Sequence, residues 1–187
     1  MEFQHFILTR FNVKAKGWET DVSGEQTLTS EWLNERFRLF KKFCLPSIQN
    51  QSLINFKWLI YFDNNIDQKY RLFINRICLE NQFIVAIYVN NMGEMYNNLK
   101  NDIINNIQGT PKYLITTRLD NDDGFQINSI AWIQKYFNYQ KYEFINLNRG
   151  LIYDLHNKLL FEKFQLNNPF ISLIEKFSSN FTTVLCG

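Results

Sequence analysis

Cysteine is scarce in this sequence, with only Cys44, Cys78 and Cys186 among 187 residues. Their number is odd, they lie far apart in apolar surroundings, and no Cys-x-x-Cys spacing occurs, which argues against paired thiols. We therefore expect buried, reduced thiols in a cytoplasmic protein.

Long apolar runs and basic clusters are also lacking. No uninterrupted apolar stretch approaches the roughly 20 residues that cross a bilayer, and the strand-like N-terminal segment 3–11 contains Arg10 and no small-residue cleavage site. We expect neither a transmembrane segment nor a signal peptide, so any membrane association would be peripheral. The formal net charge of +2 is mild and no run of Lys and Arg occurs, which argues against a nucleic-acid partner.

Aromatic residues, by contrast, are abundant. Phe, Tyr and Trp make up 17% of the chain, hydrophobic residues 45% and charged residues 20%, which is an ordinary globular composition. A chain of this length can bury one substantial core. The sequence predicts a single domain over residues 1–187 whose core is built largely from aromatic rings.

Short apolar runs alternate with segments of helical period along most of the chain. This alternation is typical of an α/β fold, with a mostly parallel, Rossmann-like sheet flanked by helices. The expected strands are 6–11, 56–62, 83–89 and 113–117, and the expected helices are 33–44, 70–78, 95–107 and 128–139. The first helix should stop before Pro46.

The C-terminal third predicts a small antiparallel section. Residues 144–147 resume a strand, and 151–155 and 159–161 are expected to pair as a hairpin. An apolar helix is expected over 170–175, and the chain ends in a strand-like run over 181–187. The polar segment 17–30 is rich in Thr, Ser and Gly and is expected to form an exposed loop that folds over a ligand.

Polar side chains follow several of the expected strands. Thr9 and Arg10 end the first, Asp63 ends the second, and Arg118 with Asp120 follows the fourth. In an open parallel sheet, ligands bind outside the carboxyl ends of the strands. We expect these side chains to converge on one crevice.

The densest acidic cluster is Arg118-Leu119-Asp120-Asn121-Asp122-Asp123-Gly124. Three carboxylates this close repel one another and raise one another's pKa values, and a divalent cation relieves that repulsion. Oxygen ligands suit Mg²⁺ or Mn²⁺, which bind one or two carboxylates together with substrate phosphates. The spacing does not fit a calcium-binding EF-hand loop. The alternative is a polar turn that caps a helix.

Three segments carry a resemblance to a known family. They are His5-Phe6-Ile7-Leu8-Thr9-Arg10-Phe11-Asn12, Phe43-Cys44-Leu45-Pro46-Ser47 with Gln51, Phe56 and Trp58, and Thr116-Thr117-Arg118-Leu119-Asp120-Asn121-Asp122-Asp123. Together they resemble the rhamnosyltransferase-like family of bacterial GT-A glycosyltransferases over most of the chain. The last segment resembles the Asp-x-Asp element of such enzymes.

The resemblance implies a metal-dependent glycosyltransferase. Its donor would be a nucleotide diphosphate sugar, and its acceptor a glycan or lipid-linked hydroxyl. The resemblance implies that Asp122 binds Mn²⁺ or Mg²⁺ directly, that Asp120 lies near the metal or the ribose, and that Asp63 contacts the nucleoside. Thr9 and Arg10 would lie under the nucleotide, and Arg118 would stabilise charge on the departing diphosphate. Asp63 as a helix cap and Arg10 in a surface ion pair are the structural alternatives.

A general base must come from outside the metal-binding carboxylates. Glu175 is the candidate, because it follows the expected apolar helix after Pro169. An ordinary surface glutamate is the alternative.

Two other functions stay open. A metal-dependent phosphohydrolase or nucleotidyltransferase would also use clustered aspartates, although the sequence has no Gly-x-x-x-x-Gly-Lys-Ser/Thr loop. A noncatalytic nucleotide-sugar-binding remnant is the other alternative. The resemblance favours it because family members continue further at the C-terminus, so we expect this domain to be short there.

Overall fold

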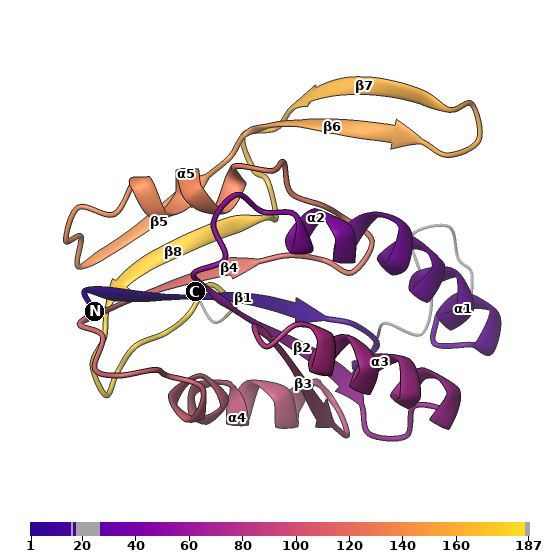
Figure 1. Cartoon of the computed structure of the whole chain (residues 1–187), viewed down its shortest axis with the longest axis horizontal. Coiled ribbons are helices and arrows are strands. Elements are labelled where there is room, and N and C mark those ends of the chain that lie inside the picture. Colours follow the sequence, from indigo (N-terminus) through magenta and orange to yellow (C-terminus); the bar gives the residue numbers. More distant parts are fainter. Residues whose placement is uncertain (16, 18–26, 186–187) are drawn as a thin grey trace.

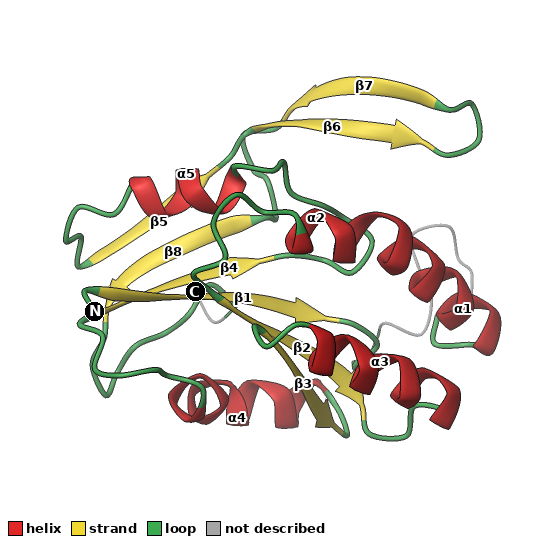
Figure 2. Cartoon of the chain, in the orientation of Figure 1, coloured by secondary structure: helices red, strands yellow, loops and turns green. Residues whose placement is uncertain are grey.

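The computed structural model describes residues 1–15, 17 and 27–185 and has an α/β architecture (Figures 1 and 2). In chain order its elements are β1 (Phe3–Arg10), α1 (Ser30–Leu39), the π-helical turn η1 (Phe40–Cys44), α2 (Leu45–Gln49), β2 (Lys57–Asp63), α3 (Gln68–Glu80), β3 (Ile84–Val89), α4 (Met92–Asn105), β4 (Tyr113–Arg118), α5 (Ser129–Lys135), β5 (Tyr142–Asn146), β6 (Arg149–Asp154), β7 (Leu159–Phe164) and β8 (Ile171–Lys176). None of the helices in these ranges is long and apolar enough to cross a membrane.

The main sheet has six strands in the order β3-β2-β1-β4-β8-β5. Strands β3, β2, β1 and β4 are mutually parallel, and β8 runs antiparallel to both β4 and β5. Strands β6 and β7 form a separate antiparallel hairpin. The predicted mostly parallel sheet and the small antiparallel C-terminal section are confirmed.

Side chains alternate between the two faces of the sheet, and each face has its own core. On β1, Ile7 packs on the face that α1, η1, α2, α3 and α5 cover, whereas Phe6 and Leu8 pack on the face that α4 covers. On β2, Trp58 and Ile60 belong to the first face. This period of two is what a strand buried on both faces requires.

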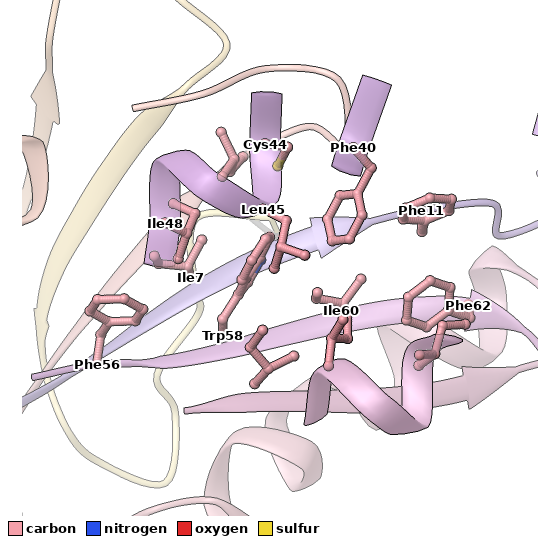
Figure 3. Packing of buried hydrophobic residues seen from close by; sticks show 14 of the residues in the cluster. Ile7, Phe11, Phe40, Cys44, Leu45, Ile48, Phe56, Trp58, Ile60 and Phe62 are labelled. Carbon is pink, nitrogen blue, oxygen red and sulfur yellow. The ribbon is translucent and has the colours of Figure 1, made fainter. Parts of the chain in front are cut away.

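The first face is rich in aromatic rings, as the composition predicts. The ring of Phe11 lies 4.4 Å from that of Phe37 and 5.0 Å from that of Phe62, measured between centroids. Figure 3 shows Phe40 over Trp58, and their ring centroids are 5.7 Å apart. These contacts fix α1 and η1 against β1 and β2, next to the ends of those strands.

The sequence predicted that the first helix stops before Pro46, and this prediction is wrong. The helix continues through η1 into α2, where proline occupies the first turn. In η1 the backbone N–H of Leu45 bonds to the carbonyl of Phe40, five residues earlier. Pro46 has no N–H to donate to the preceding turn, and the five-residue bond of η1 directly before it marks the point where the regular hydrogen-bond pattern of the helix changes.

The predicted helix over 170–175 is wrong, because this segment is strand β8. Leu173 faces one core and Ile174 the other, a period of two that a short apolar run does not reveal. Residues 181–185 form no strand, but Phe181 and Val184 pack into the core beside α4. Most of the predicted 17–30 loop, and Cys186, lie outside the described residues.

A buried polar chain crosses the middle of the sheet at His5. Its Nδ1 accepts from the Gln134 amide at 3.2 Å, so Nε2 carries the proton and donates to the Thr117 hydroxyl at 2.7 Å. Thr117 in turn lies 2.7 Å from the Ser172 hydroxyl. Burial lowers the pKa of His5 to about 3, because an imidazolium would have to be desolvated here.

We predict that His5 makes the fold acid-sensitive. The folded pKa lies below the ordinary value of 6.5, so its contribution is complete above pH 6.5 and is lost as the pH falls toward 3. Between pH 6.5 and 5 the wild type should lose about 2 kcal/mol more unfolding free energy than His5→Gln. Urea unfolding at both pH values measures this. Equal losses in the two proteins would contradict it.

Candidate active site

A cleft of about 360 Å³ opens at the carboxyl ends of β1 and β4. Of the residues expected to converge, it brings together Arg10, Arg118 and Asp120. Asp122 and Asp123, the other two carboxylates of the acidic cluster, line it as well. The parallel register of β1 with β4 explains the convergence, since both strands end at the same edge of the sheet.

The acidic loop after β4 is held to β1 by its backbone. The N–H of Leu119 donates to the carbonyl of Leu8 at 3.1 Å, and the side-chain amide of Asn121 donates to the carbonyl of Phe11 at 2.7 Å. A turn then forms, in which the N–H of Asp123 bonds to the carbonyl of Asp120 at 3.3 Å. Asn121 is thus a buried anchor that orients the aspartates on both sides of it.

The helical segment from η1 into α2 supports the same loop from the other side. The thiol of Cys44 lies 3.6 Å from the carbonyl oxygen of Asp120, and Ser47 Oγ accepts from the N–H of Phe125 at 3.2 Å. A Cβ on Gly124 would lie 3.1 Å from Ser47 Cβ and Oγ. A side chain at position 124 would therefore fit only if Ser47 or the loop moved by a few tenths of an ångström.

Ion pairs compensate part of the negative charge. Arg36 of α1 bonds to the carboxylate of Asp122, and Arg118 reaches Asp120 at 3.2 Å. Burial, and after it the charges of Asp122 and Asp120, raise the pKa of Asp123 to about 6, while Arg36 and Arg118 oppose the rise. The repulsion predicted from the sequence thus contributes, after burial, to the raised pKa of Asp123, a residue to which the sequence reasoning assigned no ligand role.

Two cleft residues, Arg36 and Trp32, were missed by the sequence reasoning. They lie one turn apart on α1, and the Arg36 guanidinium lies 5.1 Å from the centroid of the Trp32 ring. The indole N–H of Trp32 is buried and has no hydrogen-bond partner among the described residues. The only signal for them in the sequence was their spacing. Trp32 and Arg36 are four residues apart, so both lie beside the buried stripe of the helix that follows the first strand.

Asp63 lies outside this cleft. It borders a neighbouring cavity of about 170 Å³, and the two cavities share Asn12 and Leu28. Its carboxylate bonds to Lys14 at 3.0 Å and accepts from the N–H of Asn65 at 2.7 Å. Asp63 is therefore already paired, in a pocket adjoining the acidic cleft.

Thr9 is placed differently from its predicted role. Its side chain is fully buried, and its hydroxyl accepts from the Trp58 indole N–H at 2.9 Å. It does not line the cleft. Thr9 therefore anchors the core beneath the site.

Glu175 does not follow a helix and does not reach the cleft. It lies on β8 opposite Leu114, at least about 13 Å along β4 from Arg118 at a rise of roughly 3.3 Å per residue. The side chain is 3% exposed, and its carboxylate oxygens accept from the N–H groups of Thr182 and Thr183, each at 2.8 Å. This geometry ties the C-terminal segment to the sheet and gives no access to a substrate at the acidic cleft.

No group of three or more His, Cys, Asp and Glu side chains in residues 1–15, 17 and 27–185 is arranged to hold a metal ion. Cys44 is buried, and burial together with Asp123, Asp122 and Asp120 raises its pKa well above the usual value, so it remains a neutral thiol. The free thiol of Cys78 is half-buried. The oxygen donors of the cleft are therefore its aspartates.

An α/β fold with an acidic, arginine-lined cleft at the carboxyl ends of its parallel strands is a common frame for nucleotide-dependent enzymes. The family described as "Putative rhamnosyl transferase" matches residues 4–175 of this chain. The chain belongs to this family, which supports glycosyltransferase function. A comparison with curated proteins found no match.

We predict that Gly124→Ala destabilises the acidic loop. The new Cβ must displace Ser47 or its own loop, and overpacking of this kind costs about 1 kcal/mol or more of unfolding free energy. Gly150→Ala is the matched control, because no atom lies within 4 Å of the Cβ it would add. Denaturant unfolding of both variants tests this, and equal stabilities would contradict the close approach at Gly124.

Proposed function

We propose that this chain is a metal-dependent GT-A glycosyltransferase that transfers a sugar from a nucleotide diphosphate sugar to a hydroxyl group of a glycan or lipid-linked acceptor. One observation carries the proposal. Three guanidinium groups, Arg10, Arg36 and Arg118, and three aspartates line the same cleft at the strand ends. Family membership supports the sugar-transfer chemistry.

The charges of the cleft favour binding a cation and an anion together. Among the described lining residues, three arginines and three aspartates are formally balanced, so adding only a divalent cation or only a diphosphate leaves uncompensated charge in a partly buried space. Adding both restores the balance. This fits a diphosphate that arrives with its metal ion and explains why opposite charges are concentrated at one place.

Asp120 and Asp122 are the residues that would hold Mn²⁺ or Mg²⁺. Both are partly exposed to the cleft, and two carboxylates with phosphate oxygens and water are an ordinary ligand set for these ions. When bound, the metal supplies electrostatic stabilisation of the diphosphate leaving group. Asn121 holds the backbone between the two aspartates and so fixes their spacing.

The arginines would act on the leaving group. Arg36 and Arg118 are at present engaged by Asp122 and Asp120. If those carboxylates bind a cation instead, both guanidiniums become available to hydrogen-bond the diphosphate, with the bidentate geometry that arginine offers to phosphate. The indole N–H of Trp32 would donate to an oxygen of the donor. Asp63, in the adjoining cavity, would contact the nucleoside.

Glu175 has no part in this proposal, because it is buried near the opposite end of β4. The free thiols Cys44 and Cys78 fit a cytoplasmic location. Arg10 ends β1 at the cleft and would lie under the nucleotide.

We predict metal-dependent binding of one nucleoside diphosphate class. UDP, GDP, dTDP and their sugar conjugates are titrated calorimetrically with and without Mn²⁺. Asp122→Asn should weaken the binding at least about tenfold, or about 1.4 kcal/mol. Glu143→Gln removes the same charge from an exposed position on β5 and should bind like the wild type.

The reaction itself is tested with the conjugate that binds. Release of the free nucleotide with transfer to a hydroxyl acceptor supports the enzyme, whereas binding without turnover favours a noncatalytic binding protein. Release of inorganic phosphate from simple esters would favour a phosphohydrolase. Failure of every nucleotide to bind the folded wild type would contradict the proposal.

A further inference from the structure

The β6–β7 hairpin exposes an unusual amount of apolar surface. Figure 1 shows it standing away from the six-stranded sheet. On β6 the exposed apolar residues are Leu151, Ile152 and Tyr153, and on β7 they are Leu159, Leu160, Phe161 and Phe164. A ring contact joins it to the body, between Tyr153 and Phe43 of η1, whose centroids are 6.0 Å apart.

The apolar side chains occupy both faces of the hairpin. Cross-strand partners share a face, so the pairing of Tyr153 with Leu160 defines one face and that of Ile152 with Phe161 the other. A hairpin that covers a core usually presents one apolar and one polar face. Here both faces carry exposed apolar side chains, so either face could pack against a partner.

The exposed area is large enough for a specific interface. The four apolar side chains on the Tyr153 face, Leu151, Tyr153, Leu160 and Phe164, are each about half exposed, and with roughly 200 Å² for a fully exposed large side chain this face presents on the order of 450 Å² of apolar surface. The largest apolar patch on a typical monomer is about 300–600 Å². A standard protein interface buries about 800 Å² on each partner.

The backbone of the hairpin is also open. Within the described residues, β6 and β7 pair only with each other as strands, so the outer edge of each is free. A two-stranded sheet alone is marginally stable in water, and an exposed apolar edge is a template for pairing with another extended strand. A partner that offers strand edges and apolar side chains together would satisfy both needs.

We propose that the β6–β7 hairpin is a dimerisation element, through which two copies of this chain associate hairpin to hairpin. Two such faces together would bury on the order of 900 Å² of apolar surface, which is about the apolar share of a standard interface of about 1,600 Å². A symmetric dimer requires a self-complementary patch, and the hairpin has one in its apolar residues and its free edges.

The charges of the hairpin favour a second copy over a lipid surface. It carries Arg149, Lys158 and Lys163 with Asp154 and Glu162, so both signs are present for pairing between copies. The two carboxylates lie on opposite faces, because Glu162 pairs with Leu151 and Asp154 pairs with Leu159. Inserting either face into lipid would bury a carboxylate, which costs free energy.

Sedimentation velocity of the full chain at about 1–100 µM tests the proposal. The wild type should be dimeric at the upper end of this range, and Leu160→Glu and Phe164→Glu, on the same face, should each weaken association at least about tenfold, because each places a charge in the apolar interface. Leu79→Glu is the matched control. It makes the same change at an 84% exposed position on α3 and should dimerise like the wild type.

A second measurement follows the thermal stability of the protein. If the dimer is the folded form, the wild-type Tm should rise with protein concentration, and the Tm of Leu160→Glu should not. A wild type that stays monomeric at about 100 µM, with a Tm independent of concentration, would overturn the proposal. Pelleting of that monomer with phosphatidylcholine–phosphatidylglycerol vesicles would assign the hairpin to a membrane surface instead.

Discussion

The parallel pairing of β1 with β4 determines where the polar groups of the cleft lie. It brings Arg10 and Arg118 to one edge of the sheet, and the bond from Leu119 to Leu8 extends the pairing beyond the last residue of β4. Asn121 then anchors the acidic turn to Phe11. If this register shifted by one residue, every side chain of β4 would change face, and both the core and the cleft would be lost.

Close packing and charge balance act together at the turn after β4. Ser47 approaches Gly124 closely and bonds to the N–H of Phe125, so the η1–α2 segment limits how far the loop can move. The aspartates are thereby held near one another despite their repulsion, and the cost appears as the raised pKa of Asp123. Arg36 and Arg118 offset part of it. In the proposed function, a cation and a diphosphate would bind together to these opposite charges.

The features of the fold that depend on local sequence pattern and on strand order were predicted from the sequence. The alternation of strands and helices, the acidic cluster at a strand end and the C-terminal hairpin were all visible, because periodicity and the strand-end rule depend on neighbours in the chain. Glu175 was misplaced because a short apolar run does not distinguish a helix from a strand buried on both faces. The role of Thr9 depends on Trp58, and that of Arg36 on Asp122. These partners are 49 and 86 residues apart in the chain, so no local sequence pattern predicts that they are in contact.

The central claim is that the cleft holds a divalent metal between Asp120 and Asp122 while a nucleoside diphosphate is bound. The most direct measurement is a crystal structure with Mn²⁺ and the bound nucleotide, with data collected at a wavelength where manganese scatters anomalously. The account predicts one strong anomalous peak within about 2.0–2.3 Å of oxygens from these aspartates and the diphosphate. A nucleotide bound elsewhere, or in this cleft with no manganese peak beside the aspartates, would contradict it.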